Sequence, residues 1–119
     1  MIISYKDLIV WQKSIELVKE VYLLTKSFPR EELYGLVSQM RRAAVAIPSN
    51  IAEGYGRKTK KDRCQFYLIS FSSALELETQ ITISKELSYI EEKETTSVIS
   101  VLQEILKMLN SMTKDVRSS

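Results

Sequence analysis

The sequence predicts an all-α protein, an antiparallel up-down-up-down four-helix bundle formed by one domain over residues 1–119. Three observations support this fold. The chain has only three glycines and two prolines, which leaves few points where a long helix must end. Apolar residues recur at spacings of three and four along four long segments, as in amphipathic helices. Short connections separate these segments, so consecutive helices should lie antiparallel, and no strand pattern competes.

The first helix is expected over residues 5–27. Ser4 and Asp7 have the spacing of a capping start, and Phe28-Pro29 ends the helix because a residue before proline avoids the helical region. One apolar stripe, which we assign to the bundle core, comprises Leu8, Trp11, Ile15, Val18 and Tyr22. A second stripe on another face comprises Val10, Leu17, Val21 and Leu24. The second stripe either widens the core or contacts another subunit.

The second helix should follow a connection at residues 30–35 and reach about Tyr55. Its apolar face consists largely of small residues and comprises Met40, Ala43, Ala44, Ile47 and Ile51. Pro48 removes a hydrogen-bond donor and should kink this helix without breaking it, because the apolar face continues in phase beyond it. Gly54 and Gly56 should then end the helix in the left-handed conformation.

The third helix should begin at Thr59, which has capping-box spacing to Asp62, and should run to about Leu87. Its expected core face comprises Tyr67, Leu68, Phe71, Ala74, Leu75 and Ile81. Further apolar residues on its other faces are Phe66, Ile69, Leu77 and Ile83. After a connection at residues 88–92, the fourth helix should end near Lys114, and residues 115–119 should fray. Its core stripe comprises Val98, Val101, Leu102, Ile105, Met108, Leu109 and Met112.

Composition excludes several classes of function. The chain has no histidine, so the commonest general base at neutral pH and the commonest metal ligand are both missing. Its single cysteine excludes an internal disulfide and fits a reducing compartment. We therefore expect no enzymatic activity, no metal or other cofactor and no small-molecule substrate. No signal peptide or bilayer-spanning segment is evident, which predicts a cytoplasmic protein with no membrane partner.

A basic turn is the candidate nucleic-acid site. It contains five cations and one anion within seven residues, although the whole chain nets only +2. The residues assigned to this site are Tyr55, Arg57, Lys58, Lys60, Lys61 and Arg63. An aromatic ring among cations suits RNA, since it offers stacking beside phosphate contacts. The alternative interpretation is an ordinary solvated loop between two helices.

A second set of polar residues surrounds the small-residue face. An ion pair of Arg41 or Arg42 with Glu76 or Glu78 fits an antiparallel helix pair, and Glu53 should lie near Lys61. Asn50 is placed to bond carbonyls freed near Pro48. A catalytic role for the carboxylates lacks a nucleophile, metal or phosphate cradle, so the structural interpretation is favoured. Four aromatic residues are likewise interpreted as core or interface: Trp11, Tyr22, Tyr34 and Tyr67.

These motifs resemble a known family. Gln39, Arg41-Arg42-Ala43, Ile47-Pro48 and Asn50-Ile51-Ala52-Glu53-Gly54 match the pattern of the four-helix-bundle proteins encoded in intervening sequences of bacterial 23S ribosomal RNA genes. The accessory proteins of diversity-generating retroelements look like relatives. Further matches, over nearly the whole chain, are Leu8, Trp11, Phe28-Pro29, Tyr34-Gly35-Leu36 and Glu76-Leu77-Glu78. Two departures are Ala46, where a serine is common, and Ser72, where a glycine is expected.

The resemblance implies a non-enzymatic homo-oligomer, expected as a five-subunit ring, that associates with RNA. The RNA would be a ribosomal intervening sequence or part of a retroelement ribonucleoprotein. The alternative is a protein-interaction scaffold that binds no nucleic acid.

Overall fold

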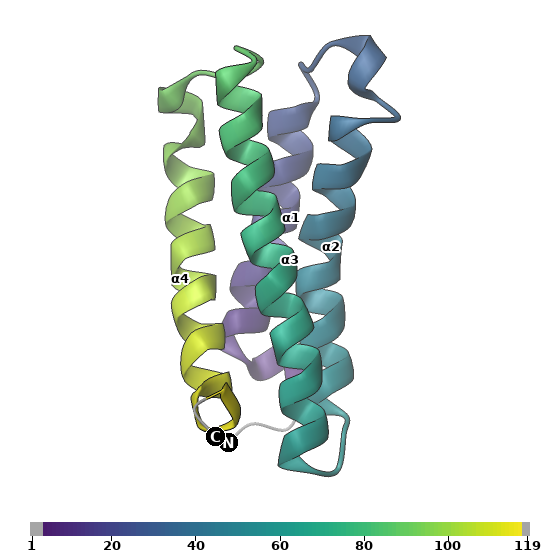
Figure 1. The fold of residues 1–119 in the computed structure, drawn as a ribbon, viewed down its shortest axis with the longest axis vertical. Helices are drawn as coiled ribbons and strands as arrows, with labels where there is room; N and C mark the ends of the chain where they lie inside the picture. Colours follow the sequence, from purple (N-terminus) through teal and green to yellow (C-terminus); the bar gives the residue numbers. More distant parts are fainter. Residues whose placement is uncertain (1–3, 118–119) are drawn as a thin grey trace.

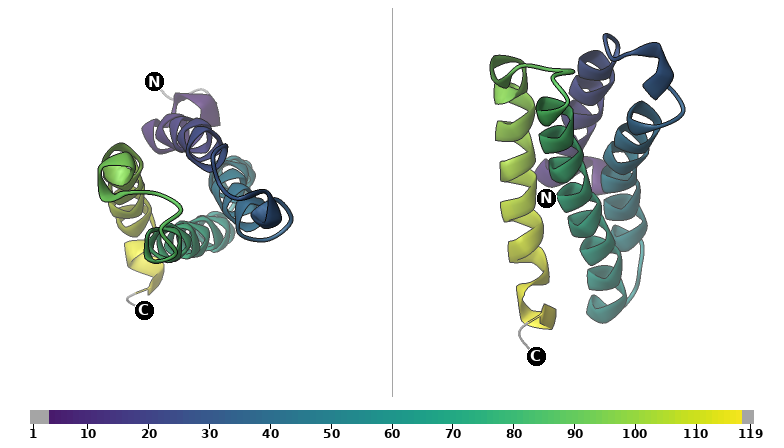
Figure 2. Two further views of the ribbon diagram at one scale, coloured as in Figure 1. Left: turned by 90° about the horizontal axis from the view of Figure 1, so that it is seen from above. Right: turned by 45° about the horizontal axis from the view of Figure 1, so that its top comes forward.

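Four helices form an up-down-up-down bundle, which confirms the predicted fold class (Figure 1). The computed structural model describes residues 4–117, and the side chains up to residue 114. Its elements are η1 (Tyr5–Asp7), α1 (Ile9–Thr25), η2 (Arg30–Glu32), α2 (Leu36–Tyr55), α3 (Lys60–Glu86) and α4 (Glu92–Arg117). Viewed from above, the helices occupy the corners of a square, and each packs against its two neighbours (Figure 2). None of the described helices is long and apolar enough to span a bilayer.

The first predicted helix is divided into a 3-10 turn and α1. The capping box at Ser4 is present: the Ser4 hydroxyl accepts from the Lys6 N–H, and the Asp7 carboxylate accepts from the Ser4 N–H at 3.1 Å. It caps η1, however, because Leu8 has an extended backbone (ψ 127°) and separates η1 from α1. At the other end of the chain, α4 continues to Arg117. The helix was expected to fray from residue 115, but residues 115–117 are helical. Residues 118–119 lie outside the described residues.

The core position of α1 differs from the prediction. Val10, Leu17 and Val21 are buried together with two polar residues, Ser14 and Thr25, so the stripe expected to be secondary is the core stripe. The hydroxyls of Ser14 and Thr25 donate to carbonyls one turn earlier, at 2.6 and 2.8 Å, which makes their burial inexpensive. The stripe assigned to the core is partly or largely exposed: it comprises Leu8, Trp11, Ile15, Val18 and Tyr22.

The core face of α3 is corrected in the same way. Leu77, expected on another face, is fully buried, whereas Leu75 is exposed and Leu68 and Phe71 are only partly buried. Tyr67, Ala74 and Ile81 are buried as predicted. The predicted core faces of α2 and α4 are confirmed. All five predicted residues of α2 are buried, and so are five of the seven predicted residues of α4. The other two, Met108 and Met112, are partly buried.

Gly54 lies inside α2, not at a left-handed helix end as predicted. No described glycine has a positive φ, and Gly56 ends the helix with φ −77°. A Cβ atom at position 54 would lie 2.8 Å from Cε1 of Tyr67 and 3.0 Å from the carbonyl oxygen of Arg63. Gly54 therefore allows α2 and α3 to approach closely beside the turn that joins them.

Pro48 is accommodated within a continuous α2 that runs from Leu36 to Tyr55, so the helix is not broken there. Hydroxyl and amide side chains bond to carbonyls of the preceding turn. The Ser70 hydroxyl donates to the carbonyl of Ile47 at 2.6 Å, and the Asn50 amide donates to the carbonyl of Ala46 at 2.8 Å. Asn50 thus bonds a carbonyl close to Pro48, as the sequence suggested, although the carbonyl that Pro48 itself leaves without a donor is that of Ala44.

The two connections at the upper end of the bundle contact each other (Figure 1). The Tyr89 hydroxyl donates to Oε2 of Glu32 at 2.8 Å, and the Tyr89 ring packs 5.4 Å from that of Phe28. The α3–α4 connection itself has a Schellman ending, in which the N–H of Tyr89 bonds the carbonyl of Ser84 and the N–H of Ser88 bonds that of Lys85. Ser88 takes the left-handed conformation that this motif requires, with φ 62°.

Candidate nucleic-acid interface

The basic turn joins α2 to α3 at the lower end of the bundle, where α4 also ends (Figure 1). Gly56 and Arg57 close α2 through backbone hydrogen bonds to Ala52 and Gly54. Thr59 then caps α3: its hydroxyl accepts from the N–H of Asp62 at 3.1 Å, the expected half of a capping box. The turn is therefore a short, hydrogen-bonded connection that holds its side chains at the start of a 27-residue helix.

The two arginines of the turn are engaged within the protein. Arg57 pairs with Oε2 of Glu53 at 3.2 Å and lies over the ring of Phe66, 4.6 Å from its centroid. Arg63 donates to the carbonyl oxygens of Arg57 and Lys58, at 3.2 and 3.1 Å. Each guanidinium is therefore already used in part within the protein, through one terminal nitrogen, and both still contribute positive charge to the turn.

The three lysines of the turn, Lys58, Lys60 and Lys61, are exposed. They surround the N-terminus of α3, where backbone N–H groups and the helix dipole add further positive potential. Tyr55, the last residue of α2, is half-buried, so less of its ring is available for stacking than the sequence suggested. The arrangement suits a phosphate-bearing polymer held by lysines, with a minor contribution from an aromatic ring.

The polar motif of α2 and α3 does not form the expected ion-pair network. Arg41 donates to the Thr25 hydroxyl at 3.0 Å and lies 4.5 Å from the centroid of the Tyr22 ring. The carboxylate of Glu76 accepts from Gln80 at 3.2 Å, and that of Glu78 accepts from Gln103 of α4 at 2.6 Å. The expected Arg41–Glu78 pair does not form because the two side chains point in different directions around their helices. Arg41 faces α1, whereas Glu78 faces α4.

Arg42, Gln39 and Glu53 are exposed. No side-chain partner for Arg42 occurs among the residues that the structure describes. The ion-pair partner of Glu53 is Arg57, one turn further along, and not the expected Lys61. An exposed pair of this kind contributes little to stability, so Glu53 contributes mainly negative charge beside the basic turn.

The aromatic residues are dispersed. Trp11 packs edge-on against Tyr5 at 5.3 Å between centroids, and Tyr34 is 93% exposed. Tyr67 is buried against Gly54, and this burial raises the pKa of its phenol above 10.0 although the nearby Arg63 guanidinium lowers it. Tyr67 is thus a neutral core residue and offers no stacking surface.

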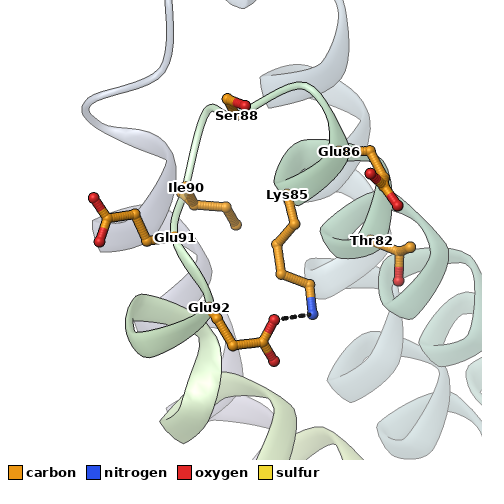
Figure 3. Close-up of a pocket in the computed structure, with 7 residues that line it drawn as sticks. All are labelled: Thr82, Lys85, Glu86, Ser88, Ile90, Glu91 and Glu92. Carbon is orange, nitrogen blue, oxygen red and sulfur yellow. Dashed lines mark hydrogen bonds and ion pairs between the residues drawn. The ribbon is translucent and has the colours of Figure 1, made fainter.

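A hollow lies at the opposite end of the bundle, beside the α3–α4 connection (Figure 3). It measures about 620 Å³, and an ion pair between Lys85 and Glu92 at 3.4 Å crosses it. Glu86 and Glu91 also line it, but their carboxylates point away from Glu92, so no convergent carboxylate site forms (Figure 3). Among the described residues, no group of three or more His, Cys, Asp or Glu side chains is placed to hold a metal ion.

A groove between α1 and α2 was not recognised as a candidate surface in the sequence. Tyr22, Leu33, Tyr34 and Val45 line it, and its charged residues are Arg41 and Arg42. The sequence did contain a hint of this surface, because the first helix has two apolar stripes and only one of them can face the core. Tyr22 belongs to the stripe that was assigned to the core of the bundle. The structure places this α1–α2 groove on the outside, where it is available to a partner.

Comparisons with known proteins agree on one family. The family model described as 23S rRNA-intervening sequence protein matches residues 6–111. Among solved structures, the chain is similar to a protein of unknown function from the S23 ribosomal protein family of Bacteroides thetaiotaomicron VPI-5482. That protein is 25% identical, with a TM-score of 0.80, and the match covers 89% of this chain and 99% of that one. No curated protein matches the sequence.

Proposed function

Since the chain belongs to the family of 23S rRNA-intervening sequence proteins, we propose that it is a non-enzymatic bundle that self-associates and contacts RNA through the basic turn. The expected assembly is a homo-oligomer, a pentamer in the form that the resemblance implies, and the expected compartment is the cytoplasm. The RNA would be a 23S rRNA intervening sequence or part of a retroelement ribonucleoprotein. No cofactor or small-molecule substrate is part of this proposal.

The exposed lysine cluster is the observation that carries the RNA contact. Residues 57–63 net +4, whereas the whole chain nets +2, so the rest of the chain nets −2. Attraction for phosphate is therefore concentrated at one end of the bundle. Each subunit would bind RNA weakly, but an oligomer presents several copies of the turn to one RNA, and linked contacts raise avidity without new chemistry.

The test is a gel shift with single-stranded and hairpin RNA at about 50 and about 200 mM salt. The variant replaces Lys58, Lys60 and Lys61 with alanine. It should bind both RNAs more weakly and with a flatter salt dependence, because each lost phosphate contact lowers the slope of log K against log salt by about 0.7 to 0.9. Stability should change little, since all three side chains are exposed.

A matched control replaces three exposed lysines elsewhere, Lys19, Lys93 and Lys107, so that net charge falls equally. Equal weakening by the two triple variants would mean that overall charge, and not the turn, attracts RNA. If the wild type shows no shift at low salt, the RNA proposal fails and the alternative of a protein-interaction scaffold stands. The exposed α1–α2 groove is the observation that favours this alternative.

A further inference from the structure

Two shallow grooves on the outside of the bundle differ in position and in charge. The α1–α2 groove has Arg41 and Arg42 as its charged residues. The second, the α3 groove, is lined by Gln65, Leu68, Ile69, Ser72, Ser73 and Glu76, and its charged residue is Glu76. The α1–α2 pair and α3 occupy different parts of the square formed by the helices (Figure 2). One chain therefore presents a cationic groove and a separate anionic one.

Both grooves also expose apolar surface. In the α1–α2 groove, Tyr22 and Val45 are each 40% exposed and Leu33 is 46% exposed. Along α3, Ile69 is 48% and Ile83 42% exposed, and they lie seven residues to either side of Glu76, on the same face of the helix. Apolar side chains on both surfaces would gain from mutual burial, and small residues in the α3 groove allow close approach.

The charged groups are placed to join across such a contact. Arg42 is exposed, and no ion pair or hydrogen bond uses its guanidinium among the described residues. Glu76 is exposed, and its carboxylate is held by the Gln80 amide at 3.2 Å, which leaves its remaining acceptor positions open. We propose, on the basis of the self-association proposed above, that the α1–α2 groove of one copy receives the α3 groove of the next, with Arg42 paired to Glu76 across the interface.

This contact is heterologous, because it uses different surfaces on the two partners. Each copy then keeps one free groove of each kind, so association continues until a ring closes. A two-fold dimer would use the same surface twice and would stop at two chains. The proposal thus predicts an assembly of more than two chains, held by one repeated interface.

The experiment measures mass against concentration by sedimentation for the wild type, Arg42→Glu, Glu76→Arg and the double variant. Each single reversal places like charges in the contact, so the concentration at half-association should rise about tenfold or more. The double variant restores opposite charges in reversed order and should assemble at close to the wild-type concentration. Circular dichroism verifies that every variant is folded, as expected for exposed side chains.

A matched control reverses two exposed charges outside both grooves, Glu16→Arg and Lys107→Glu, and should assemble like the wild type. Three outcomes overturn the proposal: a wild type that stops at two chains, single reversals that assemble normally, or a folded double variant that stays dissociated. A wild type that is monomeric at all concentrations would instead refute self-association itself. The two failures are therefore distinguishable in one data set.

Discussion

The absence of a side chain at Gly54 allows α2 and α3 to approach each other closely. The nearest atoms to a Cβ at this position belong to Tyr67, Arg63 and Phe66, at 2.8 to 3.0 Å. Two of these contacts are with a backbone carbonyl and a Cβ atom, which cannot move aside independently. By contrast, a Cβ at Gly56 would find no atom closer than 3.6 Å.

Gly54→Ala should therefore lower the free energy of unfolding by about 1–3 kcal/mol, because α2 must move away from α3. Gly56→Ala is the matched control. Since Gly56 already has a right-handed backbone, with φ −77°, alanine there should leave stability unchanged or raise it by about 0.4–1 kcal/mol. Urea unfolding followed by circular dichroism measures both. Equal stability of the two variants would contradict the close-approach explanation.

The adjacent residues Arg41 and Arg42 have different roles, although the sequence analysis gave both the same possible ion-pair partners. Arg41 is half-buried and holds the end of α1 through Thr25 and the ring of Tyr22. Arg42, one position and about 100° further around the helix, is exposed. Neighbouring cations on a helix point in different directions, so one supports the fold and the other remains available for a partner.

At the scale of elements, Glu32 connects three parts of the chain. Its Oε1 accepts from the N–H of Leu36 at the start of α2, and its Oε2 accepts from the Tyr89 hydroxyl in the α3–α4 connection. These bonds, first that from Leu36 and then that from Tyr89, lower the pKa of Glu32 below its ordinary value of 4.5. The carboxylate thereby links the two connections at the upper end of the bundle.

A pKa that is lower in the folded state means that the ionised form stabilises the fold. This contribution is present above pH 4.5 and is lost as the pH falls through the lower folded-state pKa. Glu32→Gln should therefore be less stable than the wild type at pH 7, and the difference should shrink in acid. Urea unfolding at pH 7 and at pH 3 measures this difference. Glu31→Gln is the neighbouring control, and a pH-independent difference for Glu32→Gln would contradict the assignment.

At the scale of the whole molecule, the bundle has an asymmetric distribution of charge and apolar surface. The basic turn lies at one end, and the apolar α1–α2 groove lies along one side. Exposed apolar residues also occur on α3, where Ile69, Leu75 and Ile83 are 42–48% exposed. Exposed apolar side chains that gather in one groove, as Tyr22, Leu33 and Val45 do in the α1–α2 groove, are typical of an association site.

We therefore expect light scattering at micromolar concentration to give a mass several times 13.7 kDa. Replacement of Tyr22 and Val45 by serine should lower this mass, because it removes apolar area from the α1–α2 groove. Ile9→Ser is the control, since Ile9 is 60% exposed but does not line the groove. A wild-type chain that scatters as a monomer would refute the expectation.

The sequence by itself predicted four long helices and the family, although it did not separate η1 from α1. Helix limits follow from local signals such as Thr59, Pro29 and the apolar periodicity of α2 and α4, which depend on neighbours within one turn. The faces of α2 and α4 are the clearest, because most of the apolar residues of each helix lie on one side, and their burial could be predicted directly. The motif from Gln39 to Gly54 carried the resemblance to the family, and the family model that matches residues 6–111 confirms it.

Only the tertiary structure decided which faces of α1 and α3 are buried and which polar groups meet. Both helices are apolar on more than one side, and their true core lines contain hydroxyls and an amide: Ser14, Thr25, Ser70, Gln80 and Ser84. Serine and threonine hydroxyls can bond carbonyls of their own helix, so their burial leaves no apolar signal to read. The uninterrupted apolar stripe from Leu8 to Tyr22 was therefore assigned to the core, although it lies on the outside of the bundle. The partners of Arg41, Glu76 and Glu78 depend on rotation about the helix axes, which packing sets and local sequence does not.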